Sequence, residues 1–538
     1  MALLEQLNPT VVYTAAIAFL LFKFVIYPSL LSPLAKIPAA RWHARFSPLF
    51  SWYIKYYKLE NITVFTLHQK YGPIVRLGPK ELSINCYEGG LKTVYTGDFP
   101  KTEFYPRSFS HYGLPNMIAH TDSNRHAVKR KMLSKVYSKS YALSSTTRRV
   151  TTLAVLFDRL VPFLQAKVDA QQPVEILKLS YAYSMDSFMT YQFGVSEGSN
   201  AILDESFLNW YLDNFFAPRP WAFWIIEQPN IAKFLSYFGI RLVPKKAADA
   251  TNALEAWHLE VCDRSEKALQ NSNDGDELEA SDYPIVYSTV RSKHRELDAK
   301  SGYNAKEKQV YPRRLELASE MCDNVAAAFE TSGNTITWLT YELCRRPEFQ
   351  TRLRAELATL SQPIDDVDLS AASDAFPDFK DLDSLPFLDA ILYETMRLWP
   401  AAPGFQPRQT PSGGAVLAGY HNIPGGVRVQ ASAYSLHRNK EVFPEPETWR
   451  PDRWLEATPD QLAEMRRWFW AFGSGSHTCL GNHLAMLSMK AAIATIYSRY
   501  HSVIYDAEGI EQDDGFVAGP KGQKLWVRLR PWDTPLCS

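Results

Sequence analysis

One short loop constrains this sequence more than any other feature. Residues 472–481 read FGSGSHTCLG, so a single cysteine, Cys479, lies among glycines and small polar residues. Glycine adopts backbone angles that other residues avoid, and it lets the chain approach another group closely. The apolar pattern of residues 480–497 predicts a helix directly after the cysteine, whose N-terminus would stabilise negative charge on the sulfur. Three interpretations are open: a surface loop, half of a zinc site, or a dedicated metal ligand.

Ligand chemistry favours the third interpretation. His477 and His483 flank Cys479, but a structural zinc site needs four ligands, usually with paired cysteine spacing, and the sequence has no second pair. A haem needs only one axial protein ligand, and a cysteine thiolate is one of the recognised choices. The six cysteines are far apart, which argues against a disulfide framework and fits a reducing compartment.

The N-terminal apolar run is the second informative feature. Residues 10–27 are long enough to cross a bilayer core of about 30 Å as a helix, and basic residues follow the run but do not precede it. The positive-inside rule then places the body in the cytoplasm. A cleaved signal peptide and a buried core helix are the alternatives, although the basic start and small-residue exit of a signal peptide are missing. Pro28, Pro33 and Pro38 predict that the helix stops after residue 27 and that residues 28–50 form a hinge.

The rest of the chain, residues 51–538, reads as one large domain. Apolar residues recur at helical spacing over 315–343, which predicts a central buried helix, and short β segments are expected near 71–86, 415–430 and 515–530. The expected class is mainly α with small β-sheets (α+β). Basic and acidic residues number 58 each, so no net charge favours nucleic acid as a partner.

The loop resembles the haem-binding signature of the cytochrome P-450 superfamily. The positions that fit the signature are Phe472, Gly473, Gly475, Cys479 and Gly481. The resemblance implies a cytochrome P-450 fold, with haem b bound through the thiolate of Cys479. The family most often has arginine two positions before the cysteine, where this chain has His477. A neutral imidazole there would hold a haem propionate more weakly.

A second motif lies in residues 388–403. Glu394 and Arg397, followed by Leu-Trp-Pro, resemble the family's K helix, and Arg453 matches the third member of its structural triad. A carboxylate between two guanidiniums forms a bidentate network, which we interpret as structural. The Glu-x-x-Arg pattern also occurs at 342/345, 447/450 and 464/467. Taken alone, any such pair is expected to be an exposed helical ion pair worth a few tenths of a kcal/mol.

A third motif lies in the predicted central helix. Ala327 and Ala328, then Glu330 and Thr331, resemble the small pair, acid and threonine of the family's I helix. A threonine that bonds back to a helix carbonyl can open room for O2 and water, and the adjacent acid can pass protons. The alternative is a solvated Glu-Thr pair, which the apolar flanking residues disfavour.

The remaining matches concern the haem propionates. By resemblance His126 and Arg130, i and i+4 on the family's C helix, and Arg408 would reach a propionate. Each of them is equally compatible with an ordinary surface cation. Further basic residues of the C helix, together with Arg466 and Arg467, could form a rim where the family docks an acidic redox partner.

The resemblance covers nearly the whole chain and implies a membrane-anchored monooxygenase similar to fungal members of the endoplasmic reticulum, with residues 51–538 as the haem-thiolate catalytic domain facing the cytoplasm. Electrons would come from NADPH through a separate cytochrome P-450 reductase, and one atom of O2 would enter a C–H bond. The aromatic-rich residues 207–244 suggest a lipophilic substrate reached from the lipid bilayer, with core packing as the alternative. A terpenoid or polyketide intermediate of specialised metabolism is expected; a fatty acid, a xenobiotic, or an isomerase or dehydratase that needs no reductase is the alternative.

Overall fold

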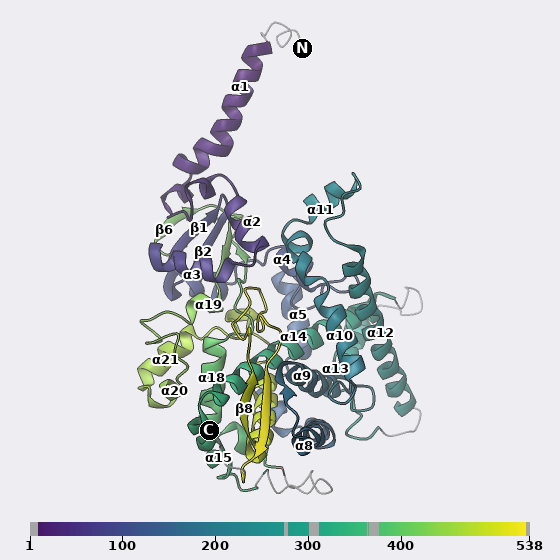
Figure 1. Ribbon diagram of the computed structural model, residues 1–538. Coiled ribbons are helices and arrows are strands. Elements are labelled where there is room, and N and C mark those ends of the chain that lie inside the picture. Colours follow the sequence, from purple (N-terminus) through teal and green to yellow (C-terminus); the bar gives the residue numbers. More distant parts are fainter. Residues whose placement is uncertain (1–8, 274–277, 301–310, 363, 365–375, 534–538) are drawn as a thin grey trace.

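The protein is mainly helical, with three small sheets set at the edges of a large helical body (Figure 1). The computed structural model describes residues 9–273, 278–300, 311–362, 364 and 376–533. The expected α+β class is confirmed, and the β segments expected near 71–86, 415–430 and 515–530 are found at 74–84, 415–430 and 526–531. The two-residue strand at 174–175 and the strand at 500–506 were not predicted.

The N-terminal helix projects away from the body (Figure 1). Helix α1 (Pro9–Leu21) runs on into the wider π-helical segment η1 (Phe22–Leu31). Together residues 10–31 are exposed and are long and apolar enough to cross a membrane. The predicted stop after residue 27 is wrong, because Pro28 lies inside η1. In the wider turn Ser32 N donates to Tyr27 O, five residues back, so the proline ring is accommodated without ending the helix.

The strands of the described residues form three sheets. The first has the order β1 (Ile74–Gly78), β2 (Glu81–Ile84), β7 (Arg428–Gln430) and β4 (Arg408–Gln409), in which only the β2–β7 pair is parallel. The second joins β3 (Val174–Glu175), β9 (Trp526–Pro531) and β8 (Tyr500–Asp506), all antiparallel. The third is the hairpin of β5 (Ala415–Leu417) and β6 (Tyr420–Ile423). In the first sheet, β4 fixes the position of Arg408.

Helix α14 (Tyr311–Cys344) is the central element, close to the predicted helix over 315–343. Its apolar stripe, which includes Val325 and Phe329, is fully buried in the main core. It crosses α9 (Ile176–Phe193) at Gly333, where an added Cβ would lie 2.4 Å from the ring of Tyr181. Glycine therefore sets the close approach of the two helices.

The other helices surround this pair. In the N-terminal half they are α2 (Leu49–Tyr56), α3 (Glu60–Tyr71), α4 (Phe104–Phe109), α5 (Ser123–Leu133), α6 (Lys139–Ser144), α7 (Thr146–Leu153), α8 (Val161–Asp169), α10 (Glu205–Phe216), α11 (Pro229–Ser236), α12 (Lys245–Asn273) and α13 (Ile285–Lys300). In the C-terminal half they are α15 (Pro347–Leu357), α17 (Phe379–Asp383), α18 (Pro386–Leu398), α19 (Ala433–Leu436), α20 (Asp452–Glu456), α21 (Pro459–Trp468) and α22 (Asn482–Arg499). Short 3₁₀ or π segments are η2 (Pro33–Lys36), η3 (Trp42–Arg45), η4 (Tyr87–Thr96), η5 (Ala154–Leu160), η6 (Arg219–Trp221), η7 (Phe223–Glu227) and η8 (Gly475–His477).

Candidate functional site

The cysteine loop is shaped by two glycines. Gly473 and Gly475 have φ angles of 67° and 71°, in the left-handed region that favours glycine. At Gly475 a Cβ would also lie 2.3 Å from the carbonyl oxygen of Tyr95, so the loop packs backbone to backbone against η4. Cys479 N donates to Phe472 O at 2.8 Å and closes the loop. The fold thus holds Cys479 one turn before α22.

The surroundings of the Cys479 thiol act on its pKa in opposite directions. The backbone N–H groups of Gly481 and Asn482, at the start of α22, donate to the sulfur, and Arg130 lies within electrostatic range. These groups lower the thiol pKa, but burial within the protein outweighs them and the net direction is upward. Cys479 is nevertheless exposed to solvent. Both observations hold if the thiol faces an open space that protein surrounds, and a metal ion in that space would supply the missing positive charge.

Helix α14 also has an exposed position within its buried length. Ala327 is exposed although Val325 and Phe329, on either side, are fully buried. Thr331 Oγ1 donates to Ala327 O at 2.7 Å, which is the back-bond anticipated for this threonine. Tyr137 lies within electrostatic range of both Cys479 and Asp323, one turn before Ala327. The thiol and this face of α14 are therefore neighbouring walls.

Glu330 has a partner that the sequence did not reveal. Its Oε2 forms an ion pair with a guanidinium nitrogen of Arg219 in η6, whereas Oε1 is buried and has no hydrogen-bond partner. The Arg219 side chain also lies over the rings of Phe215 and Phe216. No spacing motif marks Arg219, because residues 330 and 219 meet only through the packing of η6 over α14.

The four predicted propionate contacts gather beside the cysteine loop. His477 Nδ1 and His126 Nε2 are 3.1 Å apart, and His477 Nε2 lies 3.1 Å from Asp98 Oδ1. Arg130 Nη1 donates to Thr478 O at 2.7 Å. Burial, then the charge of nearby Lys101, lowers the pKa of His126 to about 4 and that of His477 to about 3. Both imidazoles are therefore neutral at pH 7.

Two buried cations complete this cluster. Arg408 is 2% exposed, donates to Tyr105 Oη and leaves Nε without a partner. Lys101 pairs with Arg408 in a β-bridge and is 5% exposed. Burial and the charge of Arg408 lower the pKa of Lys101 to about 7. Sequence reasoning missed Lys101, since only the strand pairing brings it to Arg408.

These residues fit a haem. Lys101 lies within electrostatic range of Arg408 and Arg130 and of the carboxylates of Asp98 and Asp323. Arg408 Nε is buried without a hydrogen-bond partner, so the cluster has room for a further acceptor. Two propionates would supply both the charge and the acceptors. The thiol of Cys479 would be the iron ligand, and the small Ala327 is exposed on the neighbouring face of α14.

The structure brings together the predicted triad. Glu394 and Arg397 are 0% exposed, and Arg453 is 3% exposed. Glu394 accepts from Arg397 Nε and Nη2 at 2.9 and 2.8 Å and from Arg453 Nε at 3.0 Å. Trp454 Nε1 and the backbone N–H of Arg450 also donate to Glu394, at 2.9 Å each. The network joins α18 to the segment that precedes the cysteine loop.

One expectation about the other Glu-x-x-Arg pairs is wrong. Glu342 does not form an ordinary exposed pair, because it is 1% exposed, lies 3.8 Å from Arg345 and makes its closest contact with Arg346. Its Oε1 also accepts from Trp399 Nε1 at 2.8 Å. The burial of α14 decides this, which the local motif does not encode. Glu464/Arg467 is exposed, as expected.

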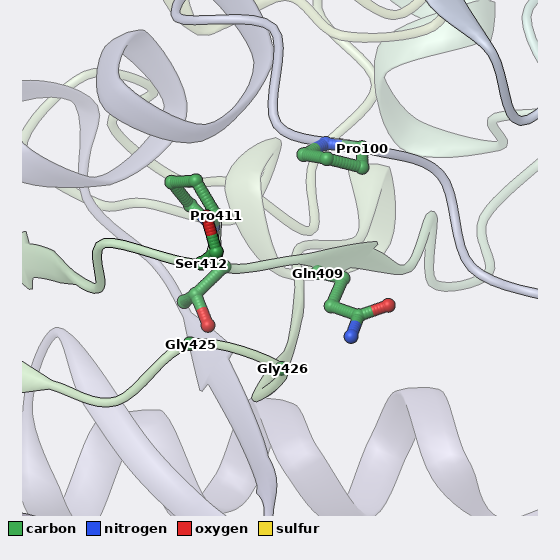
Figure 2. Close-up of a pocket in the computed structure, with 7 residues that line it drawn as sticks. Pro100, Gln409, Pro411, Ser412, Gly425 and Gly426 are labelled. Carbon is green, nitrogen blue, oxygen red and sulfur yellow. The ribbon is translucent and has the colours of Figure 1, made fainter.

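A separate groove lies at the end of the first sheet (Figure 2). Its lining residues are Pro100, Gln409, Thr410, Pro411, Ser412, Gly425 and Gly426. None of these side chains is titratable, and the groove opens at the surface near the turn between β6 and β7. It therefore offers no acid, base or charged side chain for catalysis or metal binding.

Comparison with known proteins agrees with the site. The profile of the family described as Cytochrome P450 matches residues 46–527. The chain is 28% identical over 517 residues to a "Cytochrome P450 monooxygenase" of Aspergillus terreus, covering 93% of this chain and 97% of that protein. It is 26% identical over 520 residues to "Cytochrome P450 monooxygenase orf2" of Aspergillus niger, covering 94% of each. It is also 28% identical over 537 residues to "Cytochrome P450 monooxygenase aflU" of Aspergillus parasiticus, covering 95% of this chain and 96% of that protein. The chain therefore belongs to the cytochrome P450 family of monooxygenases, which are oxidoreductases that use a haem-thiolate iron and O2.

Proposed function

We propose that this chain is a membrane-anchored monooxygenase that hydroxylates, or otherwise oxidises, a C–H bond of a lipophilic substrate. The observation that carries the proposal is Cys479, which is exposed, accepts from amide N–H groups at the start of α22 and lies beside the cations Arg130, Lys101 and Arg408. When bound, haem b would supply O2 activation and C–H oxidation. A separate NADPH-dependent reductase would supply the electrons.

The residues that would hold haem b have distinct tasks. Cys479 would be the axial ligand, while Gly473 lets the loop backbone lie close to the ring, with Phe472 beside it. Arg408 and Arg130 would bind the propionates as charged donors, with Lys101 beside Arg408. His477 and His126, both neutral, would contribute hydrogen bonds only. Glu394, Arg397 and Arg453 would hold the loop's scaffold without touching the cofactor.

Two α14 side chains would manage protons. Thr331 Oγ1 uses its proton to donate to Ala327 O, so its oxygen lone pairs are available to accept a hydrogen bond from a water molecule. Glu330 Oε1 has no partner and can hold a proton, while Arg219 fixes Oε2. The pair would thus deliver protons to the open side of α14.

The membrane side of the molecule supports the choice of substrate. Helix α11 lies at the same end of the body as α1 (Figure 1), and its surroundings expose Phe234, Tyr237, Phe238 and Ile240. Such a patch favours contact with a bilayer and entry of an apolar substrate from it. We place the protein in the endoplasmic reticulum membrane as a single-pass protein, with residues 10–31 as its anchor and the catalytic domain in the cytoplasm. A specialised metabolite such as a terpenoid or polyketide intermediate is the proposed substrate class.

The test is the reduced-plus-CO absorption spectrum of the purified protein. A thiolate-ligated haem gives a Soret band displaced to longer wavelength than an imidazole-ligated one, and a Cys479→Ala variant should lose that displaced band. A band typical of imidazole ligation in the wild type, or an unchanged band in Cys479→Ala, would contradict the proposal. O2 consumption that requires both NADPH and the reductase separates it from a reductase-independent isomerase.

A further inference from the structure

The first half of α14 carries three polar side chains that the fold leaves unsatisfied. Glu320, Asp323 and Asn324 are 1%, 8% and 9% exposed, so each is at least nine-tenths buried. Glu320 Oε1 and Asn324 Nδ2 have no hydrogen-bond partner. Within the described residues the Asp323 carboxylate accepts no hydrogen bond either; its neighbours act only through their charge. Burial of such groups costs about 1–3 kcal/mol each unless a partner is supplied.

These three side chains lie on the α14 face that borders the open space. At 100° per residue, positions 320, 323 and 324 fall about 20°, 40° and 60° from Ala327 around the helix axis. Ala327 is exposed in the middle of the buried helix. Cys322, by contrast, lies on the far side of the helix, where it is buried and hydrogen-bonded to His111 and His258. Asp323 therefore lies on the side of the space, one turn from Ala327, whereas the unpartnered Glu320 Oε1 and Asn324 Nδ2 are themselves buried on the same face.

The neighbouring elements do not complete the site. Met117 N, in the segment after α4, donates to Glu320 Oε2 at 3.0 Å but leaves Oε1 free. His111 hydrogen-bonds Cys322 and Glu255, and Lys101 donates to Ile118 O, so neither of these cations hydrogen-bonds Asp323. Lys129 lies within electrostatic range of Glu320 without bonding it. The free atoms are mostly acceptors, with one amide donor among them.

We propose that Asp323, supported by Glu320 and Asn324, forms a polar subsite that binds a hydroxyl or N–H group of the substrate. The inference rests on the proposed function, because the open space is then the substrate chamber. It narrows the substrate class to lipophilic molecules that already bear a hydrogen-bond donor about one helical turn from the oxidised carbon. A pure hydrocarbon would leave the acceptors desolvated and unpaired, and sites of this kind reject analogues that lack the donor.

The experiment compares two series of probes of equal chain length, alkan-1-ols and their methyl ethers, with chains of six to twelve carbons. Changing the chain length changes how far the apolar chain of the probe extends into the chamber from its hydroxyl or ether group. Dissociation constants are measured by calorimetric titration of the haem-loaded full chain, for wild type, Asp323→Asn, Asp323→Leu and the surface charge control Glu260→Gln. We expect at least one alcohol to bind about tenfold more tightly than its ether in the wild type and in the control.

In Asp323→Leu the preference for that alcohol should fall to within about twofold, and Asp323→Asn should be intermediate because its amide oxygen still accepts. Equal affinities of alcohol and ether at every length in the wild type would overturn the proposal. A preference that persists unchanged in Asp323→Leu would overturn it as well. The reduced-plus-CO spectrum is recorded first for each protein, so that failure of thiolate ligation, which would contradict the proposed function, is separated from failure of the subsite.

Discussion

Replacement of Glu394 by glutamine tests whether the buried triad stabilises the fold around the cysteine loop. The two Glu394 oxygens accept five hydrogen bonds, three of them from the guanidiniums of Arg397 and Arg453. Glutamine keeps the shape, removes the charge and turns an NH₂ group toward these donors. Two guanidiniums would then be buried without a counter-charge. Removing one partner of a buried ion pair costs about 3–5 kcal/mol, a large share of the roughly 5–15 kcal/mol that stabilises a typical protein.

The matched control is Glu464→Gln in the same Glu-x-x-Arg motif. Glu464 and Arg467 are 2.7 Å apart, but their side chains are 41% and 47% exposed. A pair of this kind contributes about 0–1 kcal/mol. The assay is urea unfolding, followed both by tryptophan fluorescence and by the thiolate-type CO band, with midpoints compared at a common slope. Because the triad joins α18 to the segment before the cysteine loop, the CO band should vanish at lower urea in Glu394→Gln. A midpoint shift no larger than that of Glu464→Gln would refute the reasoning.

Three further predictions concern the residues that would hold the haem. Gly475→Ala should abolish haem incorporation, since the φ of Gly475 is +71° and an added Cβ would lie 2.3 Å from a backbone oxygen. In the control Gly413→Ala no atom lies within 4 Å of the added Cβ, so the haem content measured by absorbance should match that of the wild type. The pKa of Lys101 is about 7 in the folded protein against an ordinary 10.5, so between these pH values the unfolded chain binds more protons than the folded one. The free energy of unfolding of the haem-free protein should therefore rise as the pH rises from 7 to 10.5. In urea titrations, Lys101→Met should flatten that rise. Arg130→Ala should lose haem to apomyoglobin faster than His477→Ala, because Arg130 is charged and also donates to the cysteine loop, while His477 is neutral; equal loss rates would contradict this ranking.

The sequence alone identified the parts of the site whose spacing is local. The glycines and the cysteine lie within ten residues, and Glu330–Thr331 and Glu394–Arg397 lie within single helical turns, so the backbone geometry of a loop or helix already constrains them. The central helix and most β segments followed from apolar periodicity for the same reason. The prediction that the helix ends before Pro28 was wrong. A proline removes one local hydrogen bond, but the helix continues where its turn can widen, and the sequence does not show this.

Contacts between distant segments were decided by the tertiary structure. Arg219 reaches Glu330, Lys101 reaches Arg408, and Glu320 meets Met117 only where packed elements cross. The same packing determines which polar groups lose their water, and hence which pKa values shift and which acceptors are left for a ligand to satisfy. Sequence therefore determined the family and the chemistry of the thiolate loop. The fold determined the counter-charges, the partner of Glu330 and the unpartnered polar groups of α14, because desolvation and long-range contact depend on the arrangement of the whole chain.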